Sequence, residues 1–204
     1  MGMAWLRFER QLDLVCTEDP ARNSDVLGTG SSMQCRKMVE IETKISLADL
    51  RKEKDKVSNS STVWQLKHER LSKAQAKERV KYQSSYKWAS DKNEKDMIHG
   101  VDWSDEDHSN LPTQFYFLVP ADIAPKAELI VAELFPHASL MIGRPSVRGT
   151  YQVGYIEVIK KAPVLHRLLI SKGIKGQISH RMASEICKLR LDKMRDKWST
   201  KDGG

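Results

Sequence analysis

Long apolar runs and cysteine pairs are both missing from this sequence. No apolar stretch approaches the roughly 20 residues that a membrane-spanning helix needs, and the opening MGMAWLR is too short and too quickly charged for a secretory signal. The cysteines, Cys16, Cys35 and Cys187, lie far apart without a CxxC pair, which excludes a disulfide scaffold and disfavours a zinc finger. These absences predict a cytoplasmic protein with no membrane partner.

Acidic residues are outnumbered by basic ones, and the excess is uneven. The 204 residues carry 34 Lys and Arg against 27 Asp and Glu, a net charge of +7. Residues 44–95 hold 14 basic and 7 acidic residues, and residues 157–201 hold 12 and 4, whereas residues 96–109 hold five acids and no Lys or Arg. Two basic blocks suit a polyanionic partner such as DNA, although solvated helix surfaces would give the same counts.

Apolar periodicity predicts an α/β fold with a central mixed sheet flanked by helices. The clearest strand is 38–46, where apolar residues alternate with Glu40, Glu42 and Lys44, and QFYFLVP at 114–120 is typical of a buried strand. Ser46 is expected to cap a helix. We expect further strands at 25–28, 138–143 and 153–159, and helices at 125–134 and 177–198.

Aliphatic residues are scarce between positions 51 and 110, which are rich in Lys, Ser and Gln. We interpret 51–110 as a basic helical arm ending in an acidic loop, inserted into a single domain that spans 1–204. The arm should extend from the core with few contacts to it. The basic helix at 177–198 would then follow the last strand.

The charged face of 38–46 is the most informative pattern for chemistry. Glu42 and Lys44 are two residues apart, so their side chains emerge side by side on a strand. A carboxylate there can hold a divalent cation, and the neighbouring lysine can orient water or stabilise phosphate charge. Asp25, at a predicted strand start, is the best placed second carboxylate. An alternating charged strand is, however, also typical of a solvated sheet face.

Several short stretches together resemble the PD-(D/E)XK nuclease superfamily. They are SDVL at 24–27, VEIETKIS at 39–46, ADL at 48–50, FYFLVP at 115–120 and VIKKAP at 158–163. The set looks most like small DNA-repair-type, nuclease-like proteins of phages and bacteria. It implies a restriction-endonuclease-like mixed sheet flanked by helices, on which Asp25 and Glu42 bind Mg²⁺ (or Mn²⁺) and Lys44 positions the attacking water, and it leaves the insertion at 51–110 unexplained.

The sequence departs from that pattern in three places. Ser24 stands where the nominal motif has proline. Glu40 adds a carboxylate on the same face as Glu42, so that the metal ligands could shift by one pleat. The helix that usually precedes the first strand is short, unless residues 5–14 form it, in which case Glu9 is an additional acid near the metal.

Two residues of the arm, Lys67 and His68, could meet a phosphate, although a solvated basic helix explains them as well. The leading hypothesis is thus an enzyme, a Mg²⁺-dependent nuclease acting on DNA, with a homodimer left open. The alternatives are a non-catalytic nucleic-acid-binding module on the same fold and a protein–protein adaptor that docks through the arm.

Overall fold

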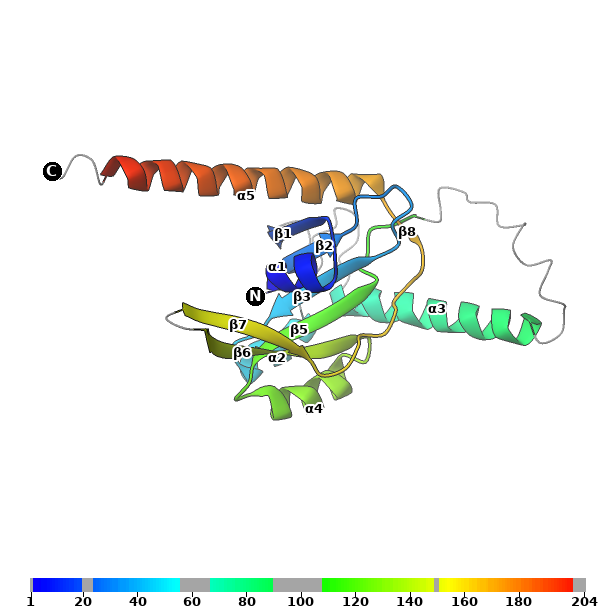
Figure 1. The fold of residues 1–204 in the computed structure, drawn as a ribbon. Coiled ribbons are helices and arrows are strands. Elements are labelled where there is room, and N and C mark those ends of the chain that lie inside the picture. The colour runs from blue at the N-terminus through cyan, green and yellow to red at the C-terminus, as the bar shows by residue number, and fades with distance from the viewer. Residues whose placement is uncertain (1, 20–23, 56–66, 90–107, 149–150, 200–204) are drawn as a thin grey trace.

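A six-stranded sheet forms the centre of the protein (Figure 1). The computed structural model describes residues 2–19, 24–55, 67–89, 108–148 and 151–199. The elements are, in chain order, α1 (Gly2–Ala4), the π-helical turn η1 (Trp5–Glu9), β1 (Leu14–Asp19), β2 (Ser24–Thr29), β3 (Met38–Thr43), α2 (Leu47–Lys52), the 3-10 turn η2 (Glu53–Asp55), α3 (Lys67–Ala89), β4 (His108–Ser109), β5 (Gln114–Pro120), α4 (Ala124–Leu134), β6 (Ala138–Arg148), β7 (Tyr151–Val158), β8 (Leu169–Ile170) and α5 (Lys172–Ser199).

The strand order across this sheet is β1-β2-β3-β5-β6-β7. The first three strands form an antiparallel meander, β5 runs parallel to both β3 and β6, and β7 is antiparallel to β6. Parallel neighbours need long crossover connections, and α2 and α3 lie in the one between β3 and β5, while α4 lies in the one between β5 and β6. The predicted α/β class with a mixed sheet is confirmed.

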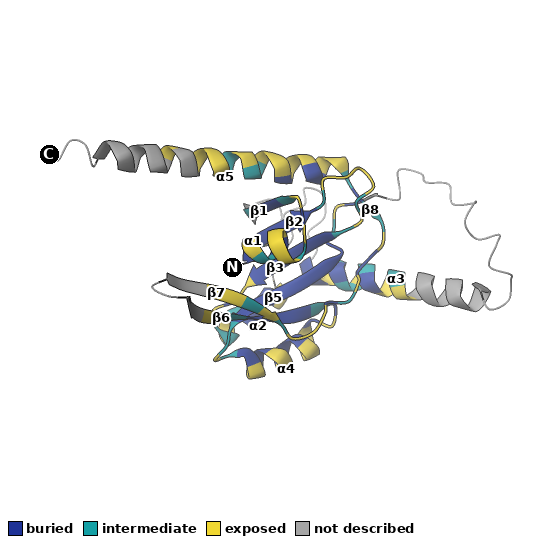
Figure 2. Cartoon of the chain, viewed as in Figure 1, coloured by how far each residue is buried: buried dark blue, intermediate teal, exposed yellow. Residues whose placement is uncertain are grey.

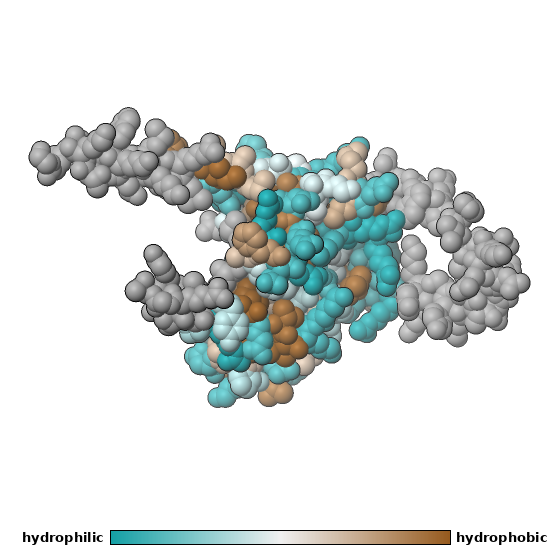
Figure 3. Space-filling model, in the orientation of Figure 1, coloured by the Kyte–Doolittle hydropathy of each residue, from teal (hydrophilic) through white to brown (hydrophobic). Residues whose placement is uncertain are grey.

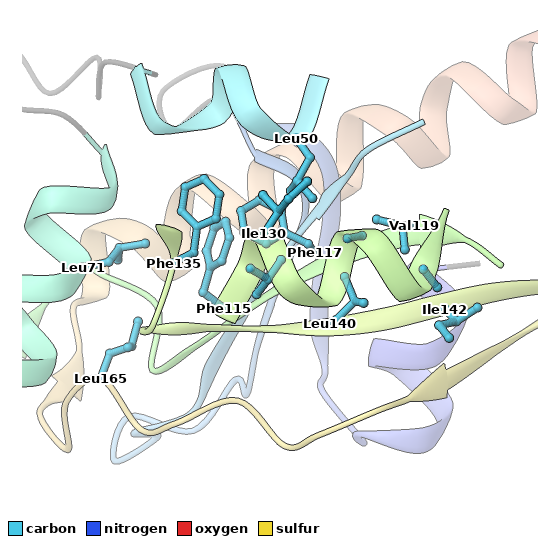
Figure 4. Close-up of a cluster of buried hydrophobic side chains, with 13 residues drawn as sticks. Leu50, Leu71, Phe115, Phe117, Val119, Ile130, Phe135, Leu140, Ile142 and Leu165 are labelled. Carbon is cyan, nitrogen blue, oxygen red and sulfur yellow. The ribbon is translucent and has the colours of Figure 1, made fainter. Parts of the chain in front are cut away.

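Both faces of the sheet carry buried side chains. On one face, Phe115 and Phe117 of β5 pack with Leu50 of α2 and the apolar side of α4 (Figure 4). Val39 and Ile41 of β3 point to the opposite face, where they join a core that includes residues of η1. Figure 2 shows β3 and β5 as buried strands. Because side chains alternate along a strand, the even-numbered residues of β3 must enter the face that Phe115 and Phe117 share.

The C-terminal helix α5 begins at Lys172, before the predicted start at 177. Gly173 and Gly176 each disfavour a helix by about 1 kcal/mol. However, Ile174 and Ile178 are buried against a core that includes Leu27 of β2. Burial of two isoleucine side chains, at roughly 1.5–3 kcal/mol each, outweighs the glycine cost.

Two other features of the fold were not predicted. β6 continues past its last partner in β5, Gly143, and forms a two-stranded ribbon with β7 that runs through Pro145. Proline is tolerated there because only one neighbouring strand is paired at that point. The short parallel pair of β4 and β8 has two residues in each strand, which is too few for any periodicity to reveal.

The inserted arm contacts the core more than we expected. Four residues at the start of α3 are buried, namely Lys67, His68, Leu71 and Gln75, and Leu71 belongs to the same core as Phe115. Farther along, Figure 1 shows α3 running outward from the sheet. Most of the predicted acidic loop lies outside the described residues. Among the described helices, none combines the length and the apolarity that crossing a bilayer requires.

Candidate functional site

The charged residues of β3, and Lys44 directly after it, lie in the interior of the protein rather than on a solvated face. Glu40, Glu42 and Lys44 are only 2%, 0% and 6% exposed. Glu40 and Glu42 stand beside Phe115 and Phe117 in the parallel ladder with β5. The backbone N–H of Lys44 donates to the carbonyl of Leu118 at 2.9 Å, which holds Lys44 at the end of the same ladder. This burial excludes the interpretation of the strand as a solvated sheet face.

The ammonium of Lys67 lies between two carboxylates of β3. Its Nζ is 2.5 Å from Glu42 Oε1 and also forms an ion pair with Glu40 Oε1. It further lies 5.1 Å from the ring centre of Phe115. Burial alone would lower the pKa of Lys67, but the two carboxylates outweigh it and raise this pKa above its ordinary value. Glu40 and Glu42 therefore converge on one cationic position.

A second ion pair joins β3 to the turn that follows α2. Lys44 Nζ lies 2.6 Å from Glu53 Oε2 and 3.7 Å from Glu42 Oε2. Burial opposes the charged form of Lys44, yet the hydrogen bond and charge of Glu53, followed by the charge of Glu42, raise its pKa. Lys44 is thus held as a cation, which suits it to stabilise negative charge and not to accept a proton. Ser46 caps α2 as predicted, since its Oγ accepts from the N–H of Asp49 at 3.1 Å.

A chain of hydrogen bonds leads from Glu53 to the side of α3. His68 Nε2 lies 3.2 Å from Glu53 Oε1, His68 Nδ1 lies 2.8 Å from His137 Nε2, and His137 Nδ1 lies 2.9 Å from Ser72 Oγ. Because the carboxylate can only accept, each imidazole carries its proton on Nε2, and the Ser72 hydroxyl donates to His137. With the protons placed in this way, every hydrogen bond from Ser72 to Glu53 has one donor and one acceptor.

Both histidines of this chain are held neutral. His68 packs between the rings of Phe115, Phe117 and Phe135, with centroids 5.3, 5.8 and 4.7 Å away. Burial lowers its pKa, although Glu53 acts in the opposite direction. Burial, with a smaller effect of His68, lowers the pKa of His137 to about 3. Neutral imidazoles let this part of the cluster lie among aromatic rings without a further charge.

The structure brings some of the predicted site residues together and leaves others apart. Glu42 and Lys44 belong to one cluster with Glu40, Lys67 and His68, which we name, together with Glu53 and His137, the buried ionic cluster. Asp25 lies beside it, where its Oδ2 accepts from the backbone N–H of Thr43 at 2.5 Å. Glu9 is exposed at the end of η1.

The fit of a divalent metal to these residues can be tested on the same geometry. In the part of the chain that the structure describes, no group of three or more His, Cys, Asp or Glu side chains is arranged to hold a metal ion. Two carboxylates do converge on one cation, Lys67. Since Mg²⁺ commonly takes only one or two carboxylates and completes its shell with water and substrate phosphates, Glu40 and Glu42 would suffice as its protein ligands.

Two members of the buried ionic cluster, Glu53 and His137, were not predicted from the sequence, and neither was Ser72, which donates to His137. A signal for Glu53 did exist, because it follows the buried Leu50 by three residues and so shares its helical face. His137 lies in the short turn between α4 and β6, and Ser72 is one of many serines in the arm. Only the folded chain reveals those two.

Comparison of this chain with protein-family models, with curated proteins and with solved structures gave no match. The function of the buried ionic cluster must therefore be argued from its own geometry.

Proposed function

We propose that this protein is a metal-dependent nuclease that hydrolyses phosphodiester bonds in DNA, on a restriction-endonuclease-like fold. The observation that carries the proposal is the convergence of Glu40 and Glu42 on one cationic position, with Lys44 3.7 Å from Glu42. Buried charges of this kind are costly to fold, and such clusters concentrate at functional sites. The E-x-K pattern and the basic surface agree with the same activity.

Each residue has a defined role in this proposal. Glu40 and Glu42 hold the metal, which when bound neutralises the scissile phosphate and lowers the pKa of a water molecule. Lys44 remains a cation, orients the attacking water and stabilises charge on the phosphate. Glu53 fixes the Lys44 ammonium from the other side, at 2.6 Å. Because the first turn of α3 covers the carboxylates, Lys67 must move aside before substrate reaches them.

Cleavage of DNA by single-residue variants tests these roles. With Mg²⁺ or Mn²⁺, the unmodified protein should cut plasmid or oligonucleotide DNA, and EDTA should stop it. Lys44→Ala and Glu42→Gln should each slow cleavage by a hundred- to thousand-fold, which corresponds to about 3–4 kcal/mol of transition-state stabilisation. The matched control is Glu157→Gln, which makes the same chemical change at an exposed carboxylate paired with Arg144, and it should cut normally.

Metal binding supplies a readout that does not depend on activity. Lys67→Met removes the internal cation and leaves Glu40 and Glu42 facing each other, so Mg²⁺ should raise the Tm of this variant more than that of the unmodified protein. Equal cleavage by Lys44→Ala and the unmodified protein would reject the assigned site. Absence both of cleavage by the unmodified protein and of a metal-dependent Tm shift would reject the nuclease.

The second candidate is a nucleic-acid-binding module on the same fold that does not cleave. The position of Lys67 favours it, since the ammonium already satisfies both carboxylates without a metal. DNA binding that is unaffected by Glu42→Gln, without cleavage under any metal condition, would establish this alternative.

A further inference from the structure

A basic pocket of about 570 Å³ lies at the other end of β3 and β5. Pockets that bind small ligands commonly measure about 300–1,000 Å³. None of the described residues that line this one is acidic, and its ionisable side chains are Arg10, Arg36, Lys37, Lys161, His166 and Arg167. The face of the protein shown in Figure 3 is mainly hydrophilic along the segment that joins β7 to α5, which carries the last three of them.

Hydrogen bonds fix the walls of this basic pocket. The side-chain amide of Gln114 donates to the carbonyl of Ala162 at 2.9 Å, and the N–H of Leu165 donates to the carbonyl of Thr113 at 2.9 Å. The guanidinium of Arg10 donates to Gln114 Oε1 at 2.7 Å and lies 5.3 Å from the ring centre of Trp5. The guanidinium of Arg10 is therefore positioned before any ligand arrives, which reduces the entropic cost of binding.

The positive charges that line the basic pocket repel one another. Burial, then Arg10 and Lys161, lower the pKa of Lys37, with Cys35 acting in the opposite direction. A bound anion would remove this repulsion. Burial lowers the pKa of His166, which is 5% exposed, so this side chain is not one of these cations. Its Nε2–H donates to the carbonyl of Leu111 at 2.8 Å, and its buried Nδ1, which has no hydrogen-bond partner among the described residues, is an acceptor that offers no donor to an anion. Arg167 contributes less, because it also forms an ion pair with Glu78 of α3 at 3.0 Å.

We propose that this basic pocket binds a phosphate group, either a backbone phosphate of a nucleic acid or a free phosphate. Arginine forks and lysines around a hollow are the groups that recognise phosphate oxygens. The pocket is separate from the buried ionic cluster: Lys37 precedes β3 and Glu42 nearly ends it, five residues apart along an extended strand, or about 16 Å at roughly 3.3 Å per residue. Phosphate binding in the basic pocket therefore does not depend on cleavage at the buried ionic cluster.

Binding measured in EDTA tests the pocket without any contribution from a metal site. The probes are a short DNA duplex, followed by fluorescence anisotropy, and inorganic phosphate, followed by calorimetry. The pocket variant is Arg36→Ala with Lys161→Ala, two exposed residues. The matched control, Lys126→Ala with Lys188→Ala, removes the same charge from exposed positions on α4 and α5. We expect the pocket variant to bind at least ten-fold more weakly than the control.

The two probes distinguish the sources of phosphate. Weaker binding of the duplex alone assigns the pocket to a nucleic-acid backbone, and the slope of log K against log salt should then fall by about two, one for each lost contact. Weaker binding of inorganic phosphate as well assigns it to free phosphate groups. The proposal is overturned if the pocket variant binds both probes as tightly as the control variant does, since net charge alone would then explain binding.

Discussion

At the scale of single residues, the buried ionic cluster is held together by complementary placement of charge. Removing one partner of a buried ion pair typically costs about 3–5 kcal/mol, because the remaining charge stays in the interior. Lys67 and Lys44 each contact two carboxylates, and Glu53 contacts both Lys44 and His68. Each member therefore depends on its neighbours, and single substitutions should act through the whole cluster.

Acid should weaken the fold through His137. In the unfolded chain this imidazole binds a proton near pH 6.5, whereas in the folded protein its pKa is lowered to about 3. Between these values the unfolded state binds more protons, so the free energy of unfolding falls as the pH falls, by about 1.4 kcal/mol per pH unit for one proton. Urea unfolding at pH 7, 6 and 5 measures this slope.

The variant His137→Gln separates this effect from the titration of carboxylates. Glutamine keeps a donor and an acceptor for His68 and Ser72 but does not titrate. Its free energy of unfolding should therefore vary with pH less steeply than that of the unmodified protein. The difference in slope should be up to about 1.4 kcal/mol per pH unit, the value for one proton. Identical slopes for the two proteins would show that folding does not lower the pKa of His137.

At the scale of elements, α3 is part of the core at its start. Leu71 is 1% exposed and packs in the cluster that contains Phe115 and Phe135 (Figure 4). Leu71→Ala should lower the free energy of unfolding by about 2–5 kcal/mol, because it removes buried methyl groups and leaves a cavity. Chemical denaturation is the measurement.

The control for this prediction lies on the same helix. Lys77 is exposed, so Lys77→Ala should change the free energy of unfolding by less than about 0.5 kcal/mol. If Leu71→Ala were equally harmless, α3 would be an arm with few core contacts, as its composition suggests.

The sequence allowed some elements to be predicted better than others, for physical reasons. The strand β3 has a strict alternation, and α2 begins with a serine cap, so both could be located from local patterns. The start of α3 has one leucine among polar residues, and its burial depends on Lys67 and His68 finding partners on β3 and η2. No local pattern indicates such partners, which is why the candidate residues could be named from the sequence while their contacts with one another, and with Glu53 and His137, could not.

At the scale of the whole molecule, the sheet keeps two groups of charges apart. The buried ionic cluster lies among helices at the end of β3, and the basic pocket lies where β3 and β5 begin. The first holds three carboxylates, those of Glu40, Glu42 and Glu53, around the ammonium groups of Lys44 and Lys67, whereas the second concentrates positive charge around a hollow. The two groups of charges therefore lie far enough apart to be altered independently of each other.

Double-mutant cycles on stability test this separation. Substitutions more than about 7–10 Å apart usually add within about 0.3–0.5 kcal/mol, whereas contacting residues couple by about 0.5–3 kcal/mol. Glu42→Gln combined with Lys161→Ala should therefore be additive. Glu42→Gln combined with Lys67→Met should not, because Lys67 Nζ lies 2.5 Å from Glu42 Oε1 and loss of both charges leaves less uncompensated charge than loss of one. Strong coupling of Glu42 with Lys161, or none with Lys67, would contradict the arrangement of charges in this fold.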